Sequence, residues 1–368
     1  DSRIGVDLTY YKENTRNQIM TINVPWESGV KEKLINAGNI QNSGIEIALN
    51  TTPIKKKQWQ WDLNFTYTRN RNKIVELSPD VTSYINLDGA ANYGNYRIAS
   101  VAKVGSDYGM LMSDSWIKTD EKTGKPVVGY TNKFRTVYYK RGGTVKEVGS
   151  MLPNFLGSLN STLRWKDLSL YVLFDARFGG YVASYNSRYA TAYGFSGETE
   201  KYRKGMTWTS KYANAQDKVF TDGFIPDVVF DAGTIVTTPG GTNQDVSGMT
   251  YQEAYEKGYV EPAHLQSAAY FKNSWGTGVI NDDWFKKINY IALREITLSY
   301  NVPTKISSFI GAKNLSLSFT GRNLAYLLNT APNHENPESV RGTGAAQFRM
   351  RSFMPYTASY LFTLNATF

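Results

Sequence analysis

Cysteine is absent from the 368 residues of this chain. Its absence excludes a disulfide framework, a thiolate nucleophile and a cysteine-ligated zinc or iron–sulfur site. Histidine is almost as scarce, because His264 and His334 are the only two and cannot form a multi-histidine metal site. No stretch approaches the roughly 18 to 20 apolar residues that a transmembrane helix needs. The sequence therefore offers neither a membrane-spanning helix nor the common metal chemistries.

Aromatic residues, by contrast, are abundant. Trp, Tyr and Phe make up 14% of a chain whose mean hydropathy is −0.42. Lys and Arg exceed Asp and Glu by 41 to 32, which gives a formal net charge of +9. Such a surplus favours solubility and also attracts anionic surfaces such as phosphorylated lipid head groups. The cations are spread along the chain rather than clustered with aromatics, so we expect no nucleic-acid partner.

The clearest pattern is a strict alternation of apolar and polar residues in segment 58–69. Trp59, Trp61, Leu63, Phe65 and Tyr67 are each separated by one polar residue. Only a β-strand places every second side chain on the same face. The same alternation recurs at 3–10, 45–50, 155–165, 168–178, 314–322 and 359–368. The apolar rows carry no charge, whereas the opposite rows hold Arg3, Asp7, Glu46, Asp62, Arg164, Asp175, Arg177 and Arg322.

The length of these segments favours a membrane barrel. They run for about 9 to 12 residues, which matches a tilted membrane-spanning strand. Strands of soluble proteins average about 5 to 6 residues. We therefore predict an all-β fold, a transmembrane antiparallel β-barrel in which one face of each strand meets lipid and the other meets water.

One segment breaks the alternation. Ile291 and Leu293 are in one phase, whereas Ile296 and Leu298 are in the other. Unbroken alternation would place a charged residue of the 294–295 pair on the apolar face, where an Arg near the bilayer midplane costs roughly 2 to 4 kcal/mol. A β-bulge at this pair would reset the phase, and we expect one there.

Connections between the strands alternate in length. If weaker strands at 96–105 and 109–118 are included, about ten strands are joined in turn by short and long links, as in outer-membrane barrels. The short links are 53–57, 106–108, 166–167 and 301–312, and the long ones are 13–39, 71–95, 119–152, 180–284 and 324–353. This pattern predicts short periplasmic turns on one rim and long extracellular loops on the other.

Several blocks of sequence resemble the SusC/RagA family of TonB-linked outer-membrane transporters. Residues 36–46, NAGNIQNSGIE, are similar to the family pattern N-x-G-x-I/V-x-N-x-G-x-E. Further similar blocks are Pro153-Asn154-Phe155, Phe178-Gly179-Gly180, residues 290–303, residues 315–324 and Asn336-Pro337-Glu338. The terminal Phe368, which ends an alternating strand, looks like the insertion signal of outer-membrane barrels.

The resemblance implies a fold and a function. It implies that residues 1–368 form the C-terminal part of a barrel of about 22 strands, with the plug and N-terminal domains outside this sequence. It also implies import of glycan oligomers or peptides across the outer membrane of a Gram-negative bacterium. The expected partners are a SusD-like surface lipoprotein, the remaining N-terminal barrel and plug portion, the TonB complex acting through the plug, and outer-membrane lipid. No cofactor is implied.

Candidate functional residues lie in the loops and on the polar rows. Loop aromatics stack on sugar rings or apolar peptide side chains, although many loop aromatics only pack their own loops. The candidates for substrate contact are Tyr93, Tyr96, Trp116, Tyr189, Tyr193, Tyr202 and Trp208. The polar rows would line the lumen, where the candidates for facing a plug are Arg164, Asp175, Arg177 and Arg322.

Two alternatives remain open. One is a surface adhesin or glycan-binding β-sandwich without transport activity, in which the aromatic rows would fill a protein core. The other is an outer-membrane enzyme with a small closed barrel, which would need a catalytic constellation near a histidine. Neither His264 nor His334 has an evident Ser, carboxylate or metal-ligand partner in the sequence, so we expect no catalytic residue.

Overall fold

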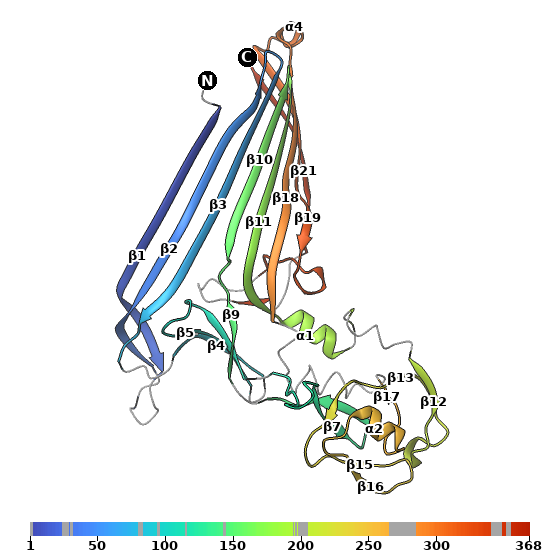
Figure 1. Ribbon diagram of the computed structural model, residues 1–368. Coiled ribbons are helices and arrows are strands. Elements are labelled where there is room, and N and C mark those ends of the chain that lie inside the picture. The colour runs from blue at the N-terminus through green and yellow to red at the C-terminus, as the bar shows by residue number, and fades with distance from the viewer. Residues whose placement is uncertain are drawn as a thin grey trace.

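Eight long antiparallel strands form one curved sheet that dominates the computed structural model (Figure 1). The structure describes residues 3–23, 29, 32–79, 84–93, 96–114, 116–142, 145–193, 195, 197, 205–264, 285–339, 348–350 and 355–368. The strand order is β1-β2-β3-β10-β11-β18-β19-β21, so each long strand pairs with the next long strand of the chain. Over the described residues the sheet is open, with β1 and β21 as its edges.

The strands extend well beyond the length of ordinary soluble strands. Their bounds are β1 (Ile4–Asn23), β2 (Glu32–Lys55), β3 (Trp59–Glu76), β10 (Phe155–Trp165), β11 (Leu168–Ser184), β18 (Phe285–Val302), β19 (Asn314–Asn329) and β21 (Ser359–Thr367). A short strand, β20 (Arg349–Met350), pairs in parallel with the end of β11. Both termini lie at the end of the sheet that carries the short turns (Figure 1).

The apolar face of the sheet is bare. On β1 the side chains of Ile4, Val6 and Leu8 are 68%, 66% and 67% exposed, and on β21 Phe362 is 71% exposed. Burial of such side chains in protein would have hidden them from solvent, as in a sandwich core. This exposed face is the one expected to meet lipid.

Aromatic rows border the apolar face at both ends. At the turn end Trp59 stacks on Trp165, with ring centroids 5.6 Å apart. At the loop end Phe155 stacks between Tyr67 at 5.3 Å and Phe178 at 4.8 Å. The eight-residue step from Trp59 to Tyr67 corresponds to about 26 Å along the strand. With the usual tilt, it spans most of the roughly 25 Å apolar band of an outer-membrane barrel.

The opposite face carries hydrogen-bonded polar side chains. Side chains hydrogen-bond across the strands of this face: Asn64 with Asn160, Thr66 with Ser158, and Ser299 with Ser318. The segments around residues 59–67, 155–165 and 168–178 also pair in register. The predicted alternation is therefore confirmed for these three segments.

Two of the predicted barrel strands were wrong. Residues 96–118 do not join the main sheet. They contribute β5 (Tyr96–Ala102) and β6 (Met110–Ser113) to a separate sheet with β4 (Ile85–Tyr93) and β9 (Lys146–Ser150), in the order β4-β5-β6-β9. Residues 99–102 of β5 are buried on both faces, unlike a strand with one lipid face. The connection from β3 to β10 therefore includes all of these strands, and the long sheet has eight strands rather than ten.

The segment 13–39 was also predicted wrongly, as one long loop. Most of it extends the β1–β2 hairpin, which pairs as far as Asn23 with Glu32. Asn17 and Gly38 both have positive φ, of 55° and 94°, and lie at an interruption of this ladder between two paired segments. Both faces of the extension are rich in polar residues, so alternation could not reveal it.

Within the 36–46 block, Gly44 has a packing role. It pairs with Tyr11 on β1, whose ring lies over the glycine so closely that an added Cβ would collide with it. The carbonyl oxygen of Arg69 would also lie 2.7 Å from that Cβ. Any other residue at this position would require the Tyr11 ring to move and the backbone of β3 at Arg69 to shift.

The turn end carries one short helical link. Residues 303–313 contain α4 (Thr304–Ser307) and the 3-10 turn η5 (Ser308–Ile310), which ends at Gly311 with a φ of 75°. Phe309 at this turn is 90% exposed. Among the described residues, no helix is long and apolar enough to cross a bilayer.

The loop end carries a small folded unit with its own core. It is built from β7 (Val127–Thr131), β8 (Thr136–Tyr139), β12 (Met206–Thr209), η3 (Ala213–Ala215), β13 (Val219–Phe224), β14 (Val229–Phe230), β15 (Ile235–Thr237), β16 (Asn243–Asp245), α2 (Tyr251–Glu256) and β17 (Ala263–His264). Its core packs Phe230 against Tyr251, with ring centroids 5.4 Å apart. Asp231 also joins its parts, accepting from Lys118 at 2.7 Å. We call it the loop unit (Figure 1).

A charge placed on the two faces of β10 tests this arrangement. We expect Leu159→Arg, on the apolar face, to lower the free energy of unfolding in lipid by about 2 to 4 kcal/mol, because the guanidinium would enter hydrocarbon. Ser158→Arg, one residue away on the polar face and opposite Asp175, is the matched control and should cost little. Urea titration of the protein folded into vesicles measures both, and equal losses would contradict the assignment of the faces.

Candidate functional site

A β-bulge in β18 places a charged residue at the centre of the site. Glu295 pairs with Leu173 of β11 and Leu293 pairs with Phe174, so Arg294 is an extra residue in the ladder. The register towards β19 shifts at the same point. The predicted bulge is therefore confirmed. It puts both Arg294 and Glu295 on the polar face and keeps the apolar face free of charge.

Arg294 uses this position to bridge two carboxylates. Its guanidinium donates to Asp175 of β11 at 2.7 Å and to both oxygens of Glu338 at 2.7 Å. The Arg294 side chain is only 19% exposed. A two-pronged contact of this kind fixes geometry as well as charge. Arg294 thereby ties the segment that follows β19 to the wall of the sheet.

Further hydrogen bonds hold this segment, residues 331–339, which we call the anchor segment. Tyr326 of β19 donates to Glu338 at 2.8 Å and to Asn336 at 3.1 Å. Asn329 donates to the carbonyl oxygen of Glu335 at 2.9 Å. The segment begins with the 3-10 turn η6 (Pro332–His334). It is the block Asn336-Pro337-Glu338 of the sequence that lies against the polar face.

The two carboxyls of the anchor segment differ in their environment. Burial alone would raise the pKa of Glu338, but hydrogen bonds from Arg294 and Tyr326 hold that pKa below its usual range. Burial raises the pKa of Glu335, even though Ser184 donates to its carboxylate at 3.1 Å. The lowered pKa of Glu338 favours the ionised carboxylate that Arg294 binds. The raised pKa of Glu335 favours its protonated form.

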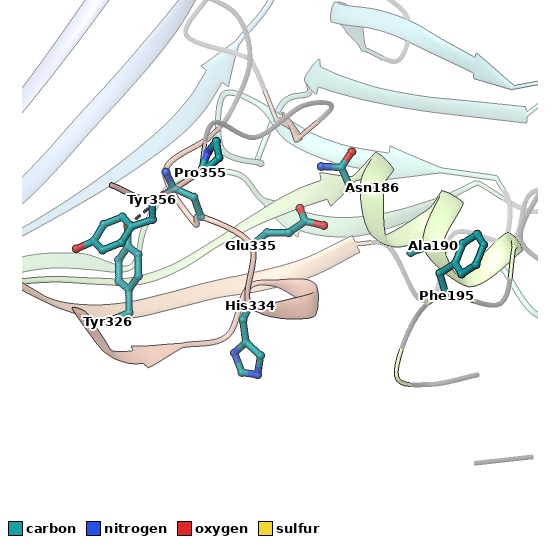
Figure 2. Close-up of a pocket in the computed structure, with 9 residues that line it drawn as sticks. Asn186, Ala190, Phe195, Tyr326, His334, Glu335, Pro355 and Tyr356 are labelled. Carbon is teal, nitrogen blue, oxygen red and sulfur yellow. Dashed lines mark hydrogen bonds between the residues drawn. The ribbon is translucent and has the colours of Figure 1, made fainter. Parts of the chain in front are cut away.

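A cavity of about 480 Å³ opens beside the anchor segment. Figure 2 shows Glu335 pointing towards helix α1 (Tyr185–Ala192), with Tyr326 and Tyr356 on the other side. The rings of the two tyrosines lie 4.6 Å apart. The buried hydroxyl of Tyr356 has no hydrogen-bond partner among the described residues. The cavity is also lined by Asn186, Ala190, Phe195, His334, Asn336 and Pro355.

This cavity combines the groups that an oligomeric polar ligand needs. Aromatic faces stack on sugar rings or apolar side chains, and amide and carboxyl groups bind hydroxyls or backbone amides. A buried hydroxyl without a partner is costly. No group of three or more His, Asp and Glu that could hold a metal occurs among the described residues.

The lumen candidates all bond to neighbours within the wall. Asp175 binds Arg294, Arg164 donates to Asp62 at 2.6 Å, and Arg322 donates to Glu295 at 2.9 Å. Arg177 donates to the carbonyl oxygens of Gly179 and Met151. Their charges are thus neutralised or satisfied in the wall itself, and a role towards a plug stays a prediction.

The loop aromatics are not brought together in one place. Trp208 stacks on Phe220 in the loop unit at 4.8 Å and donates to Glu261. Trp116 lies 6.5 Å from Phe285 at the start of β18. Tyr189 and Tyr193 are exposed at the end of α1. Their role in substrate contact stays a prediction.

Three of the aromatic candidates have side chains outside the described part of the structure. Tyr93 and Tyr96 pair through their backbones at the tip of the β4–β5 hairpin, and their side chains fall outside the description. Tyr202 lies outside the described residues altogether.

Sequence reasoning missed the residues that line the cavity. Tyr326 and Tyr356 were not among the candidates, and His334 was considered only as a catalyst. His264, the other histidine, is buried in the loop unit with its ring 4.7 Å from Phe220, and burial lowers its pKa. The block Asn336-Pro337-Glu338 was the available signal, since it marks the segment that forms the cavity wall.

Comparison with known proteins gives relatives over most of the chain. It is 23% identical over 331 residues to TonB-dependent receptor P26 of Formosa agariphila, and 25% identical over 197 residues to TonB-dependent receptor P3 of the same organism. The matches cover 88% and 50% of this chain but only 28% and 20% of the two receptors. No family model matches the chain.

Solved structures share the fold. The structures of the RagAB peptide importer in its closed-closed and open-open states match with TM-scores of 0.60 and 0.59, each at 15% identity. The match covers 100% of this chain and 34% and 33% of those chains. Together, the comparisons confirm the resemblance indicated by the sequence blocks: the chain is similar to a portion of two proteins named TonB-dependent receptors, and it shares the fold of the RagAB structures.

The anchor segment gives a test of the Arg294 bridge. We expect Glu338→Gln to weaken the segment by about 1 kcal/mol, because a charged hydrogen bond becomes a neutral one. Amide hydrogen exchange of residues 334–339 should then be roughly fivefold faster. Glu335→Gln, in the same segment, removes a carboxyl whose pKa is already raised and should not accelerate exchange. Equal effects of the two changes would contradict the assigned roles.

The same contacts predict a dependence on pH. The pKa of Glu338 is lowered in the folded protein, so its contribution is complete above the usual Glu pKa of about 4.3 and is lost as the pH falls through the lower folded value. The protection factor of residues 334–339, which is the intrinsic exchange rate at each pH divided by the observed rate, should therefore fall on acidification towards that of Glu338→Gln. The difference between wild type and this variant should shrink, and a difference that persists at low pH would count against the bridge.

Proposed function

We propose that this chain forms part of the wall of a TonB-dependent importer in the outer membrane of a Gram-negative bacterium. The observation that carries the proposal is the sheet itself. One face is bare and apolar between two aromatic rows, and the other is polar and charged. Outer-membrane barrels that transport solutes need both faces at once. The relatives supply the transport class, since they are named TonB-dependent receptors.

The proposal includes parts outside this chain. Eight strands joined in an open sheet would be completed by an N-terminal barrel portion to about 22 strands, which enclose a plugged lumen. The plug would pass energy from the TonB complex. Residues 1–368 would then be the C-terminal part of that barrel, with Phe368 as its insertion signal. The short turns would face the periplasm and the loop unit the cell exterior.

The cargo we propose is an oligomer, either a glycan or a peptide, delivered with a SusD-like lipoprotein. The cavity beside the anchor segment supports this class, because its tyrosines, amides and carboxyl suit a long polar ligand. The matched RagAB structures are described as a peptide importer or transporter, which favours peptides among the two. The names of these relatives support transport rather than catalysis.

The adhesin and β-sandwich alternative is not favoured. It needs the aromatic rows to be packed inside protein, whereas Ile4, Leu8 and Phe362 are more than half exposed. The small closed barrel with enzymatic activity lacks support as well, since His264 is enclosed by Phe220 and Trp208 rings.

Uptake measurements test the proposal. Cells that produce the complete protein should take up fluorescently labelled peptides or oligosaccharides, and a protonophore should abolish the uptake because TonB-linked import needs inner-membrane energy. Deletion of the gene should abolish uptake of one of the two classes. Uptake that persists after both treatments would overturn the importer proposal.

The cavity can be tested separately. We expect Tyr356→Ala to weaken binding of the imported oligomer about tenfold, because it removes an aromatic surface that lines the cavity. Phe309→Ala, which truncates a 90% exposed ring at the turn end of the sheet, is the matched control. Isothermal titration with the cargo identified by uptake measures both. Equal affinities of wild type and Tyr356→Ala would place the binding site elsewhere.

A further inference from the structure

The apolar face of β1, β2 and β3 changes character abruptly at the loop end. Along β1 the face runs from Leu8 and Tyr10 to Lys12, Asn14 and Arg16. The phase does not change, because these residues pair in unbroken register with β2. The face that is apolar in the middle of the sheet is therefore continued outward by cations, without a bulge that would turn them inward.

The same change occurs on β3. Beyond Tyr67, the side chains on this face are Arg69, Arg71 and Lys73, and all three are exposed. Cross-strand pairing places Arg71 opposite Ser43 and Lys73 opposite Gln41. On the far side of β2, the pairing places Lys12 opposite the same Ser43. Cations on β1 and β3 thus flank a row of small polar side chains on β2.

The flanking cations are spaced to share one anion. Neighbouring strands lie about 4.8 Å apart, so Lys12 and Arg71 project from backbones separated by about 10 Å. Long flexible side chains can converge on a group that lies over Ser43 between them. Arg69, Arg71 and Lys73 also line a polar hollow of about 440 Å³ together with Gln41 and Ser43.

Few acids oppose this charge. The acidic side chains Glu13 and Glu46 belong to the opposite phase of their strands and lie on the polar face. Glu76 pairs with Asn39 at the outer limit of the patch, and Asp107 lines the hollow. None of the five cations Lys12, Arg16, Arg69, Arg71 and Lys73 takes part in the ion pairs found among the described residues. We call these five residues the cationic belt.

The position of the belt along the strands, relative to the aromatic row at Tyr67, indicates what it contacts. Arg69 and Arg71 lie two and four residues beyond Tyr67, or about 7 and 13 Å further along the strand. An aromatic row marks the boundary between hydrocarbon and head groups. The belt therefore begins at the level of the head groups, on the outward side and at the end with the long loops. Anionic head groups attract such clusters of Lys and Arg.

We propose that the cationic belt binds the phosphorylated head group of an outer-leaflet glycolipid. The inference rests on the membrane placement proposed above and adds a lipid ligand to it. Phosphate oxygens would accept from Lys12 and Arg71 over Ser43, and Arg69 and Lys73 would hold a second phosphate or the sugar. The acyl chains would lie along the bare apolar face below, against Tyr10 and Tyr67. We infer a lipid because the cationic belt and the bare apolar face of β1, β2 and β3 form one continuous surface, which suits a charged head group joined to acyl chains.

The test compares two triple variants with the same change of charge. Arg69→Gln/Arg71→Gln/Lys73→Gln alters the belt, and Lys55→Gln/Lys56→Gln/Lys57→Gln alters three exposed lysines at the turn end. Native mass spectrometry of the complete protein in detergent, titrated with bisphosphorylated lipid A, reports binding. We expect about tenfold weaker binding for the belt variant and none of that loss for the turn variant. Dephosphorylated lipid A should bind the wild type as weakly as the belt variant binds the phosphorylated form.

Three results would overturn the proposal. Equal lipid binding by wild type and belt variant would show that the belt is not the site. Competition by inorganic phosphate at the same concentrations would assign the belt to a free anion. Failure of the wild type to insert into vesicles, measured by quenching of Trp fluorescence with brominated lipid, would overturn the membrane placement as well. If the wild type inserts normally, the first result, equal lipid binding by wild type and belt variant, would overturn the belt proposal but not the membrane placement.

Discussion

The contrast between the two sides of every long strand is the constraint on which the rest of the structure depends. Each residue of the sheet must suit either a dry or a wet neighbourhood, and its position in the strand decides which. Arg294 and Glu295 are two charged residues in succession, and β18 forms a β-bulge there, with Arg294 as the extra residue. The insertion keeps the apolar face neutral and also frees a guanidinium to hold Asp175 and Glu338. Through Glu338, that charge holds the anchor segment, whose residues His334, Glu335 and Asn336 line the cavity.

Alternation was a reliable guide wherever the two sides of a strand differ. The pairing of 155–165 with 168–178 and the bulge at Arg294 followed from the sequence because only one arrangement keeps charge away from the apolar side. The same reasoning failed where both sides are alike. Residues 96–102 are buried on both faces and residues 13–23 are polar on both, so neither shows a difference that a pattern search can detect.

The site was harder to foresee than the fold. Its residues come from β11, β18, β19, α1 and the anchor segment, and their proximity depends on pairing between strands far apart in the chain. Composition singled out the loop aromatics, yet Trp208 is committed to Phe220 and Glu261 in the loop unit. Tyr326 and Tyr356 stand in segments that no local pattern distinguishes. Only the block Asn336-Pro337-Glu338 marked the correct segment.

The contact of Tyr11 with Gly44 has a consequence for assembly of the sheet. Side chains on β1 repeat every two residues, so a hairpin displaced by two positions would still match apolar with apolar and polar with polar. Such a displaced hairpin would bring the Tyr11 ring over Asn42 or Glu46, where a side chain already occupies the space. A single glycine therefore favours one alignment of an otherwise repetitive pair of strands.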